Sequence, residues 1–315
     1  MKVLVTGGAG FIGSHLCDAL LARGDEVTVL DNFNDFYDPA IKRRNAAALD
    51  GARIVEGDIR DDALVGELFA EGVDVLVHLA AMAGVRPSLL DPLHYQDVNL
   101  RGTMVLLEAL RRSPGTRFVF ASSSSVYGGN TKVPFAETDP VECPVSPYAA
   151  TKRSGELLAY SHHHLFDIPT TCLRFFTVFG PRQRPEMAIH KFVRCVFEGQ
   201  PIPFFGDGST RRDYTYVADI VAGVVQAIDN CSGYEIYNLG ESATTSLADL
   251  VKCIGEVCGI EPIIDRQPLQ PGDVTITYAD VSKARERLGY APSTPVREGL
   301  EHFVRWYREM HSPAN

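Results

Sequence analysis

The chain has 315 residues, of which 45% are hydrophobic, and a formal net charge of −10. A chain of this length can bury one large α/β core or a major and a minor domain. The acidic balance argues against nucleic acid or an anionic membrane as a partner, and no apolar run approaches the ~20 residues of a membrane helix.

The first stretch of the chain, MKVLVTGGAGFIG, has the order strand, glycine-rich turn, helix. Residues 3–5 form an apolar run typical of a buried strand, so no signal peptide is expected before it. Gly7, Gly10 and Gly13 follow at threefold spacing, ahead of a helical run over 12–23. In a dinucleotide loop these glycines permit the sharp turn, the close approach of a pyrophosphate and the packing of helix against sheet. The pyrophosphate then lies on the free N–H groups of the helix N-terminus, whereas the alternative is a tight turn with no ligand.

A carboxylate ends the second predicted strand, residues 27–30. Asp31 lies 18 residues after Gly13, in the place where a carboxylate accepts both ribose hydroxyls of NAD and repels the 2′-phosphate of NADP. We therefore expect NAD as the cofactor, with Asn32 beside the same ribose. The basic residues that follow at 42–44 are interpreted as a solvated turn rather than as part of the site.

The third and fourth predicted strands end in groups suited to the rest of a dinucleotide. Residues 53–55 lead into Asp58, which is a candidate acceptor for the adenine amino group or simply part of a turn. The strand over 73–79 is almost entirely apolar, as expected of a parallel strand buried on both faces. Ala80 and Ala81 follow it, and their small side chains let the backbone approach the nicotinamide half of the cofactor.

Two polar residues beyond this strand are candidates for the site. Arg86 lies in a loop beside the expected cofactor and is either solvated or a partner for a substrate phosphate or carboxylate. Asn99 stands at the start of a predicted helix over 100–112. It either caps that helix or serves as a polar spacer behind the site.

A run of four serines, residues 122–125, follows the fifth predicted strand, residues 117–121. A flexible linker does not fit between a buried strand and the short aromatic turn VYG, so we expect these hydroxyls in a polar pocket. The segment from there to Pro147 is rich in Pro, Glu and Asp and is expected to be a surface excursion with a functional role.

The stretch SPYAATK predicts the start of a helix that carries a reactive pair. Ser146 suits the N-cap and Pro147 the first helical position. Tyr148 and Lys152 are four residues apart and share one helix face. A free phenol has a pKa near ~10, but a nearby ammonium group, the helix N-terminus and a cationic nicotinamide all favour the phenolate. Tyr148 is therefore a candidate general base for an alcohol proton; the alternative is a helical surface pair.

The motifs TGGAGFIG, SSSSVYG and SPYAATK, with the two aspartates above, resemble the extended short-chain dehydrogenase/reductases that act on nucleotide sugars. The resemblance implies a Rossmann-like, doubly wound parallel α/β sheet, a smaller C-terminal substrate domain, NAD as cofactor and a homodimer through helices 100–112 and 149–166. Ser123 then joins Tyr148 and Lys152 as the catalytic residues. The residues implied for cofactor contact are Gly7, Gly10, Phe11, Ile12, Gly13, Asp31, Asn32, Asp58, Ile59, Leu79, Ala80, Ala81, Asn99, Tyr148 and Lys152.

Departures from the family's other patterns narrow the choice of reaction. Ser124 and Ser125 stand where the 4,6-dehydratases carry Asp-Glu and the UDP-xylose-forming decarboxylases a Glu. The form RFFTV followed by GPRQRP resembles the UDP-glucuronate 4-epimerases, and Thr177 and Arg184 are then expected around the sugar carboxylate, which the Arg fork matches. The alternatives that remain open are a UDP-glucose 4-epimerase, a related dehydratase or decarboxylase, and a catalytically silent dinucleotide sensor or scaffold.

The same resemblance implies further contacts with a UDP-sugar. Phe192 and Phe204 are candidates for packing around the uracil or for plain core, Arg212 for the pyrophosphate, and Asp273 for the uridine ribose. The full set expected to contact substrate is Arg86, Ser123, Ser124, Ser125, Tyr148, Thr177, Arg184, Phe192, Phe204, Arg212 and Asp273.

The composition changes from about residue 180, where proline and alternating basic and aromatic residues become frequent. We predict an NAD-binding domain of residues 1–179 plus about 233–260, and a nucleotide-sugar-binding domain of about 180–232 plus 261–315. The seven cysteines lack metal-ligand spacing, so we expect no metal site and free thiols in a reducing cytoplasm.

Overall fold

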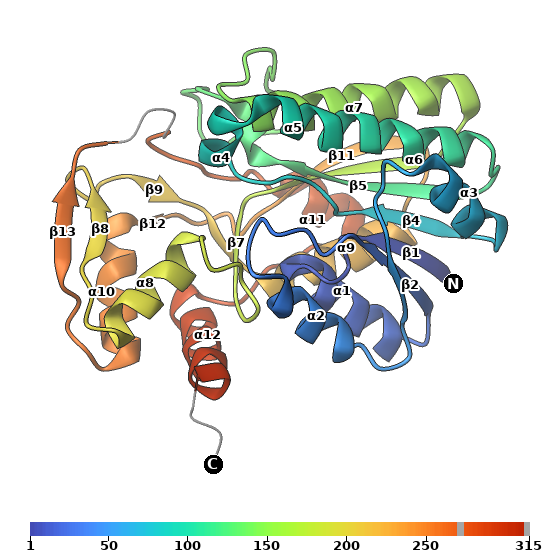
Figure 1. Cartoon of the computed structure of the whole chain (residues 1–315). Coiled ribbons are helices and arrows are strands. Elements are labelled where there is room, and N and C mark those ends of the chain that lie inside the picture. The colour runs from blue at the N-terminus through green and yellow to red at the C-terminus, as the bar shows by residue number, and fades with distance from the viewer. Residues whose placement is uncertain (270–273, 312–315) are drawn as a thin grey trace.

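A parallel sheet is the centre of the larger lobe of the molecule (Figure 1). The structure is a computed structural model that describes residues 1–269 and 274–311. Across the sheet the strands lie in the order β11 (Tyr234–Leu239), β6 (Thr170–Phe175), β5 (Arg117–Ser123), β4 (Val75–His78), β1 (Lys2–Thr6), β2 (Glu26–Asp31) and β3 (Arg53–Glu56). Every neighbouring pair is parallel. Successive strands are added outward from β1 to β3 on one side and from β4 to β11 on the other, so the strand order reverses between β1 and β4. This order confirms the predicted doubly wound fold.

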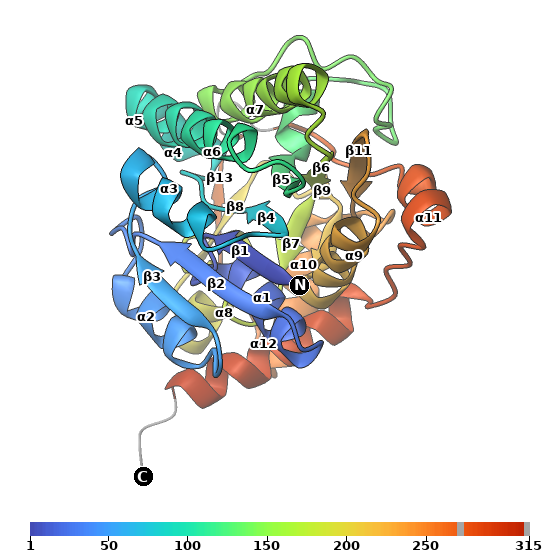
Figure 2. The same cartoon turned by 90° about the vertical axis from the view of Figure 1, so that its right-hand side faces the viewer.

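Helices cover both faces of this sheet (Figure 2). One face carries α1 (Phe11–Ala22), α9 (Val217–Asp229) and α11 (Ser282–Leu288), and the other carries α3 (Asp62–Ala70), α6 (Gly102–Arg111) and α7 (Pro147–Phe166). Side chains alternate along each strand and so supply both layers. In β1, Val3 and Val5 pack with α1 and α9, whereas Leu4 packs with α3 and α6.

Shorter helical segments border the carboxyl ends of the strands. They are α2 (Pro39–Ala47), α4 (Val85–Leu90), α5 (Pro92–Gln96), a π-helical turn (Asp97–Arg101) and a 3₁₀ turn (Ser124–Tyr127). Within residues 1–269 and 274–311, none of the helices combines the length and apolar character needed to cross a bilayer.

In the residues that the structure describes, the smaller lobe has three two-stranded sheets and its own core (Figure 1). The pairs are β7 (Thr177–Phe179) with β10 (Tyr214–Tyr216), β8 (Ile202–Phe205) with β13 (Ile264–Gln267), and β9 (Arg211–Arg212) with β12 (Thr245–Ser246). Packed with them are α8 (Ala188–Phe197), α10 (Leu247–Cys258) and α12 (Val296–His311).

The packing of three helices differs from the predicted domain boundaries. Helix α9 falls within the range given to the substrate domain, yet it packs against α1 and the main sheet, as expected of a helix that returns to that sheet before β11. Helix α10, predicted in the NAD-binding domain, packs against α8 and α12. Helix α11 returns to the main lobe beside β11. Periodicity shows that a helix has an apolar face, but the partner that covers that face is decided by tertiary packing.

Candidate functional site

A cavity of about 560 Å³ lies at the carboxyl ends of the central strands. Its walls come from the segments after β1, β2, β3, β4, β5 and β6, together with Arg184, Glu186 and Met187 of the smaller lobe. This is the edge, next to the point where strand order reverses, at which doubly wound sheets bind their ligands.

The glycine turn after β1 has the shape expected of a pyrophosphate cradle. Gly7 has φ 72°, and a Cβ there would lie 2.7 Å from the backbone N of Ala80. A Cβ at Gly13 would lie 2.2 Å from the carbonyl oxygen of Gly7, so the helix packs tightly on the turn. Gly10 precedes α1 without any side-chain cap, which leaves the first N–H groups of this helix for a ligand. The turn and helix therefore fit a dinucleotide pyrophosphate.

The carboxylate at the end of β2 is buried and lines the cavity. Asp31 accepts hydrogen bonds from the backbone N of Phe33 at 2.9 Å and of Ala9 at 3.3 Å. Burial raises the pKa of Asp31, and the charge of Lys42, with its Nζ 3.9 Å from Oδ1, opposes that shift. The interpretation of residues 42–44 as a solvated turn is wrong for Lys42, which is buried beside the cavity.

The helical spacing of the buried residues in α2 is the sequence pattern that indicates burial of Lys42. In α2, Lys42, Asn45 and Ala46 are the buried residues and share one helix face. Lys42 Nζ also donates to Asn34 Oδ1 at 2.9 Å, which holds the loop after β2 around Asp31. Arg43 pairs at the surface with Glu56, as a solvated residue should.

The predicted contact of Asp58 with adenine stays a prediction. Asp58 is not among the residues that line the cavity, and its carboxylate accepts hydrogen bonds from Arg60 and from Asn32 Nδ2. The side chain of Arg60 holds the pKa of Asp58 well below its usual range. Asp58 therefore orients Asn32, which lines the cavity together with Ile59.

The reactive pair lies at the predicted start of α7. Ser146 caps the helix by accepting from Ala149 N at 3.1 Å, and Pro147 is the first helical residue; both predictions are confirmed. Tyr148 and Lys152 line the cavity. Lys152 Nζ donates to the carbonyl oxygen of Ala121 at 2.7 Å, and burial lowers the pKa of Lys152 to about 8.

Burial and two neighbouring groups act on the phenol of Tyr148. Burial raises the pKa of Tyr148, and a hydrogen bond with Ser123 and the charge of Arg184 oppose that shift. The effect of Lys152 on the phenol stays a prediction, and its ammonium group donates to the carbonyl oxygen of Ala121 at the end of β5. Arg184, from the smaller lobe, lines the same cavity and adds a second positive charge near the phenol.

The serine run divides between two environments. Ser123 Oγ donates to Ser125 Oγ at 3.1 Å, and Ser123, Ser124 and Ser125 all line the cavity. Ser122 also borders the cavity, but its Oγ donates to Glu156 Oε1 at 2.6 Å. That glutamate lies in α7 and pairs with the buried Arg174 of β6, a network that the sequence analysis did not identify.

The other residues predicted for the site fall into two groups. Those that line the cavity are Phe11, Ile12, Leu79, Ala80, Ala81, Arg86 and Thr177, along with the residues described above. In the described part of the chain, the cavity lining does not include Asn99, Phe192, Phe204 or Arg212. Asp273 lies outside the described residues.

Packing explains the residues that do not reach the cavity. Phe192 and Phe204 are 5% and 3% exposed in the core of the smaller lobe. Arg212 donates to the carbonyl oxygen of Arg211 in β9. Asn99 lies in the π-helical turn, exchanges hydrogen bonds with the backbone of Met82, and is neither a cap nor a wall of the cavity. It supports the loop behind the site, which was the second interpretation of this residue.

Residues 3–240 match the sequence pattern of the family described as "NAD dependent epimerase/dehydratase family". UDP-glucuronate 4-epimerase 3 of Arabidopsis thaliana is 43% identical, and the alignment covers 97% of this chain and 76% of that protein. The crystal structure of UDP-glucuronic acid 4-epimerase from Bacillus cereus in complex with UDP-glucuronic acid and NAD is 36% identical, with a TM-score of 0.93 over 99% of this chain and 100% of that one.

The structure of a neutral-sugar enzyme is almost as similar to the chain. The crystal structure of the UDP-glucose 4-epimerase of Thermotoga maritima with UDP-glucose is 33% identical, with a TM-score of 0.92 over 98% of this chain and 99% of that one. Because the TM-scores are so close, the choice between an acid and a neutral sugar depends on side chains at the site.

Proposed function

Because the chain belongs to the NAD-dependent epimerase/dehydratase family, we propose that it is a UDP-glucuronate 4-epimerase, which interconverts UDP-glucuronate and UDP-galacturonate with NAD as cofactor. The names of its Arabidopsis and Bacillus relatives support this activity. The observation that carries the choice of an acid sugar is Arg184, whose guanidinium lines the same cavity as Tyr148 and acts on its pKa.

The residues of the chain provide proton transfer and orientation at C4 of the sugar. Tyr148 accepts the proton of the C4 hydroxyl and returns it at the end of the reaction, and Ser123 hydrogen-bonds the same oxygen. Lys152 has a pKa of about 8, so its ammonium form predominates at neutral pH and remains anchored on the carbonyl of Ala121. The hydride chemistry at C4 is supplied by NAD when bound, and the reaction has no net redox change.

Neutral and cationic groups suit the carboxylate end of the sugar. Ser124, Ser125 and Thr177 border the cavity with hydroxyls, and Arg184 adds the planar cation that a carboxylate prefers. The acid and base that a dehydratase or a decarboxylase requires are absent from the two serine positions. The presence of Tyr148 and Lys152 in one cavity argues against a silent sensor.

The test is to supply purified protein with UDP-glucuronate and to separate the products by chromatography. We expect UDP-galacturonate to appear. In the Arg184→Ala variant the KM for UDP-glucuronate is expected to rise about 10- to 100-fold, because a charge-assisted hydrogen bond is lost. UDP-glucose binding serves as the control and is expected to change little, and Arg184→Lys, which keeps the charge without the fork, should be intermediate. Conversion of UDP-galactose to UDP-glucose with no reaction of UDP-glucuronate would refute the acid-sugar assignment.

We also propose a homodimer formed through a helical face that contains α7, as predicted, together with α4 and α5 in place of the predicted helix 100–112, whose apolar side chains are buried or half-buried. Apolar side chains on this face are exposed: Leu90 at 88%, Leu93 at 76% and Leu157 at 52%, and α7 packs beside α4 and α5. Light scattering is expected to give twice the mass of one chain. Leu157→Glu should shift the protein to monomer, whereas Lys252→Glu on α10 is a control that should leave the mass unchanged. A monomeric parent protein would refute the proposal.

The cytoplasm is the compartment that we propose for this enzyme. All seven cysteines, which lie in the described residues, are free thiols, and Cys17 and Cys172 are fully buried. Free thiols in this number are usual for proteins kept in a reducing compartment.

A further inference from the structure

A tight turn places two opposite charges at the wall of the cavity. Met187 N donates to the carbonyl oxygen of Arg184 at 3.1 Å, which closes a four-residue turn with Pro185 in its second position. Within this turn, Arg184 Nε lies 3.1 Å from Glu186 Oε1, and both side chains line the cavity. Glu186 is thus a carboxylate of the protein in contact with the cation that the proposed substrate requires.

The loop that carries this turn is anchored in both lobes. Arg182 pairs with Asp18 of α1 at 2.7 Å. Gln183 is buried, donates to the carbonyl oxygen of Val178 and accepts from His190 N. These contacts hold the backbone next to Arg184, so changes in the pair must occur in the side chains.

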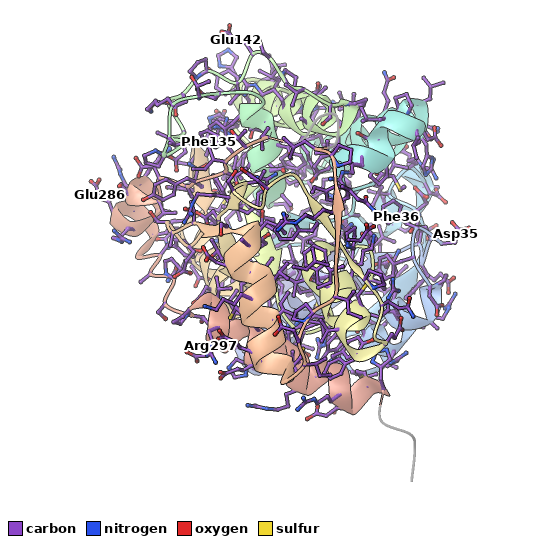
Figure 3. The ribbon with its side chains drawn as sticks, turned by 90° about the vertical axis from the view of Figure 1, so that its left-hand side faces the viewer. Asp35, Phe36, Phe135, Glu142, Glu286 and Arg297 are labelled. Carbon is purple, nitrogen blue, oxygen red and sulfur yellow. The ribbon has the colours of Figure 1, made fainter. Side chains whose placement is uncertain are left out.

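The two partners differ in how firmly they are held. The side chain of Arg184 is 21% exposed and its guanidinium lies over the ring of Phe36, 5.7 Å from the ring centroid. The side chain of Glu186 is 39% exposed. Figure 3 shows Phe36 inward of the peripheral Asp35 in the loop after β2. The aromatic ring retains the cation when a carboxylate leaves it, whereas Glu186 can turn toward solvent.

We propose that Glu186 is an exchangeable counter-ion of Arg184, which the carboxylate of a hexuronate displaces and a neutral hexose does not. The inference rests on the proposed function, since it assigns a specificity-determining residue to the same site. Glu186 occupies the guanidinium until a carboxylate brought in by the UDP-sugar replaces it. The binding free energy of a hexuronate is therefore reduced by the free energy needed to break the Arg184–Glu186 ion pair. A neutral sugar leaves this pair intact.

The experiment compares Glu186→Gln with its parent by titration calorimetry of NAD-loaded protein. Both proteins carry Tyr148→Phe, so that no turnover occurs during the titration. Because the competing charge is lost, the Kd of UDP-glucuronate is expected to fall about fivefold, the upper range for a partly exposed ion pair. The Kd of UDP-glucose should stay the same, and Glu186→Asp, which keeps the charge, should resemble the parent.

A second background isolates the pair. With Arg184→Ala also present, Glu186→Gln should no longer tighten the binding of UDP-glucuronate. An unchanged or higher Kd for UDP-glucuronate, or an equal change for both sugars, would overturn the inference. The proposed function is tested separately on the protein that keeps Tyr148. If that protein does not convert UDP-glucuronate to UDP-galacturonate, the proposed function fails, whatever the calorimetry shows for Glu186.

Discussion

Replacing Tyr148 with phenylalanine is expected to lower the rate of UDP-glucuronate epimerisation about 10³-fold, because the C4 hydroxyl loses its general base. The variant keeps the ring that packs edge-on against Tyr95, with centroids 6.4 Å apart, so binding of NAD and the thermal midpoint should remain close to those of the parent. Initial rates with UDP-glucuronate, measured by chromatography of the products, check the prediction.

Tyr95→Phe is the matched control for this substitution. Tyr95 does not line the cavity, and its hydroxyl donates to the carbonyl oxygen of Ala83 at 2.7 Å. Its loss is expected to cost about 1 kcal/mol of stability and to leave most of the activity. The role of Tyr148 as base would be contradicted if its phenylalanine variant retained activity similar to that of Tyr95→Phe.

Replacing Arg174 with methionine is expected to lower the free energy of unfolding by about 3 kcal/mol, because the buried carboxylate of Glu156 loses its bidentate partner and keeps Arg153 and Ser122 as partners. Arg174 is 1% exposed and donates to both carboxylate oxygens of Glu156 at 2.9 Å, and to the hydroxyl of Tyr127 at 3.0 Å. Although burial alone would raise it, this contact lowers the pKa of Glu156. Urea unfolding at neutral pH measures the effect.

The control removes both charges. When Glu156→Gln is added to Arg174→Met, part of the lost stability should return, because no unpaired charge stays buried. The native pKa of Glu156 is lowered, so the parent pair contributes stability above the usual glutamate pKa of ~4.3 and loses it as the pH falls through the native value. Losses that simply add in the double variant would show that the two residues act independently.

The glycine turn and the Tyr148–Lys152 pair could be predicted from the sequence because each of them lies within one short segment. The glycine turn requires a strand, a turn and a helix in succession, and all three lie within residues 2–22. The spacing of Tyr148 and Lys152 places them on one helix face by helical geometry alone. Ser146 and Pro147 likewise mark the helix start by local chemistry.

Predictions about what surrounds these segments were less reliable. Lys42 was interpreted as solvated because its neighbours in sequence are basic, yet the end of β2 covers it. The spacing of Asp58 did not indicate that Arg60 and Asn32 donate to its carboxylate. Phe204 belongs to a core whose other walls come from distant helices.

By itself, the sequence determined the family, the doubly wound sheet, the cofactor-binding turn and the identity of the reactive pair, because each of these depends on residue types at fixed short spacings. Only the tertiary structure decided that Arg184 of the smaller lobe adds its charge near the phenol of Tyr148, that Glu156 and Arg174 form a buried pair, and that α10 packs in the smaller lobe. The physical reason is that the electrostatic potential at a side chain, and the residues that bury one face of a helix, come from segments far apart in the chain. No local spacing of residues specifies how those segments pack together.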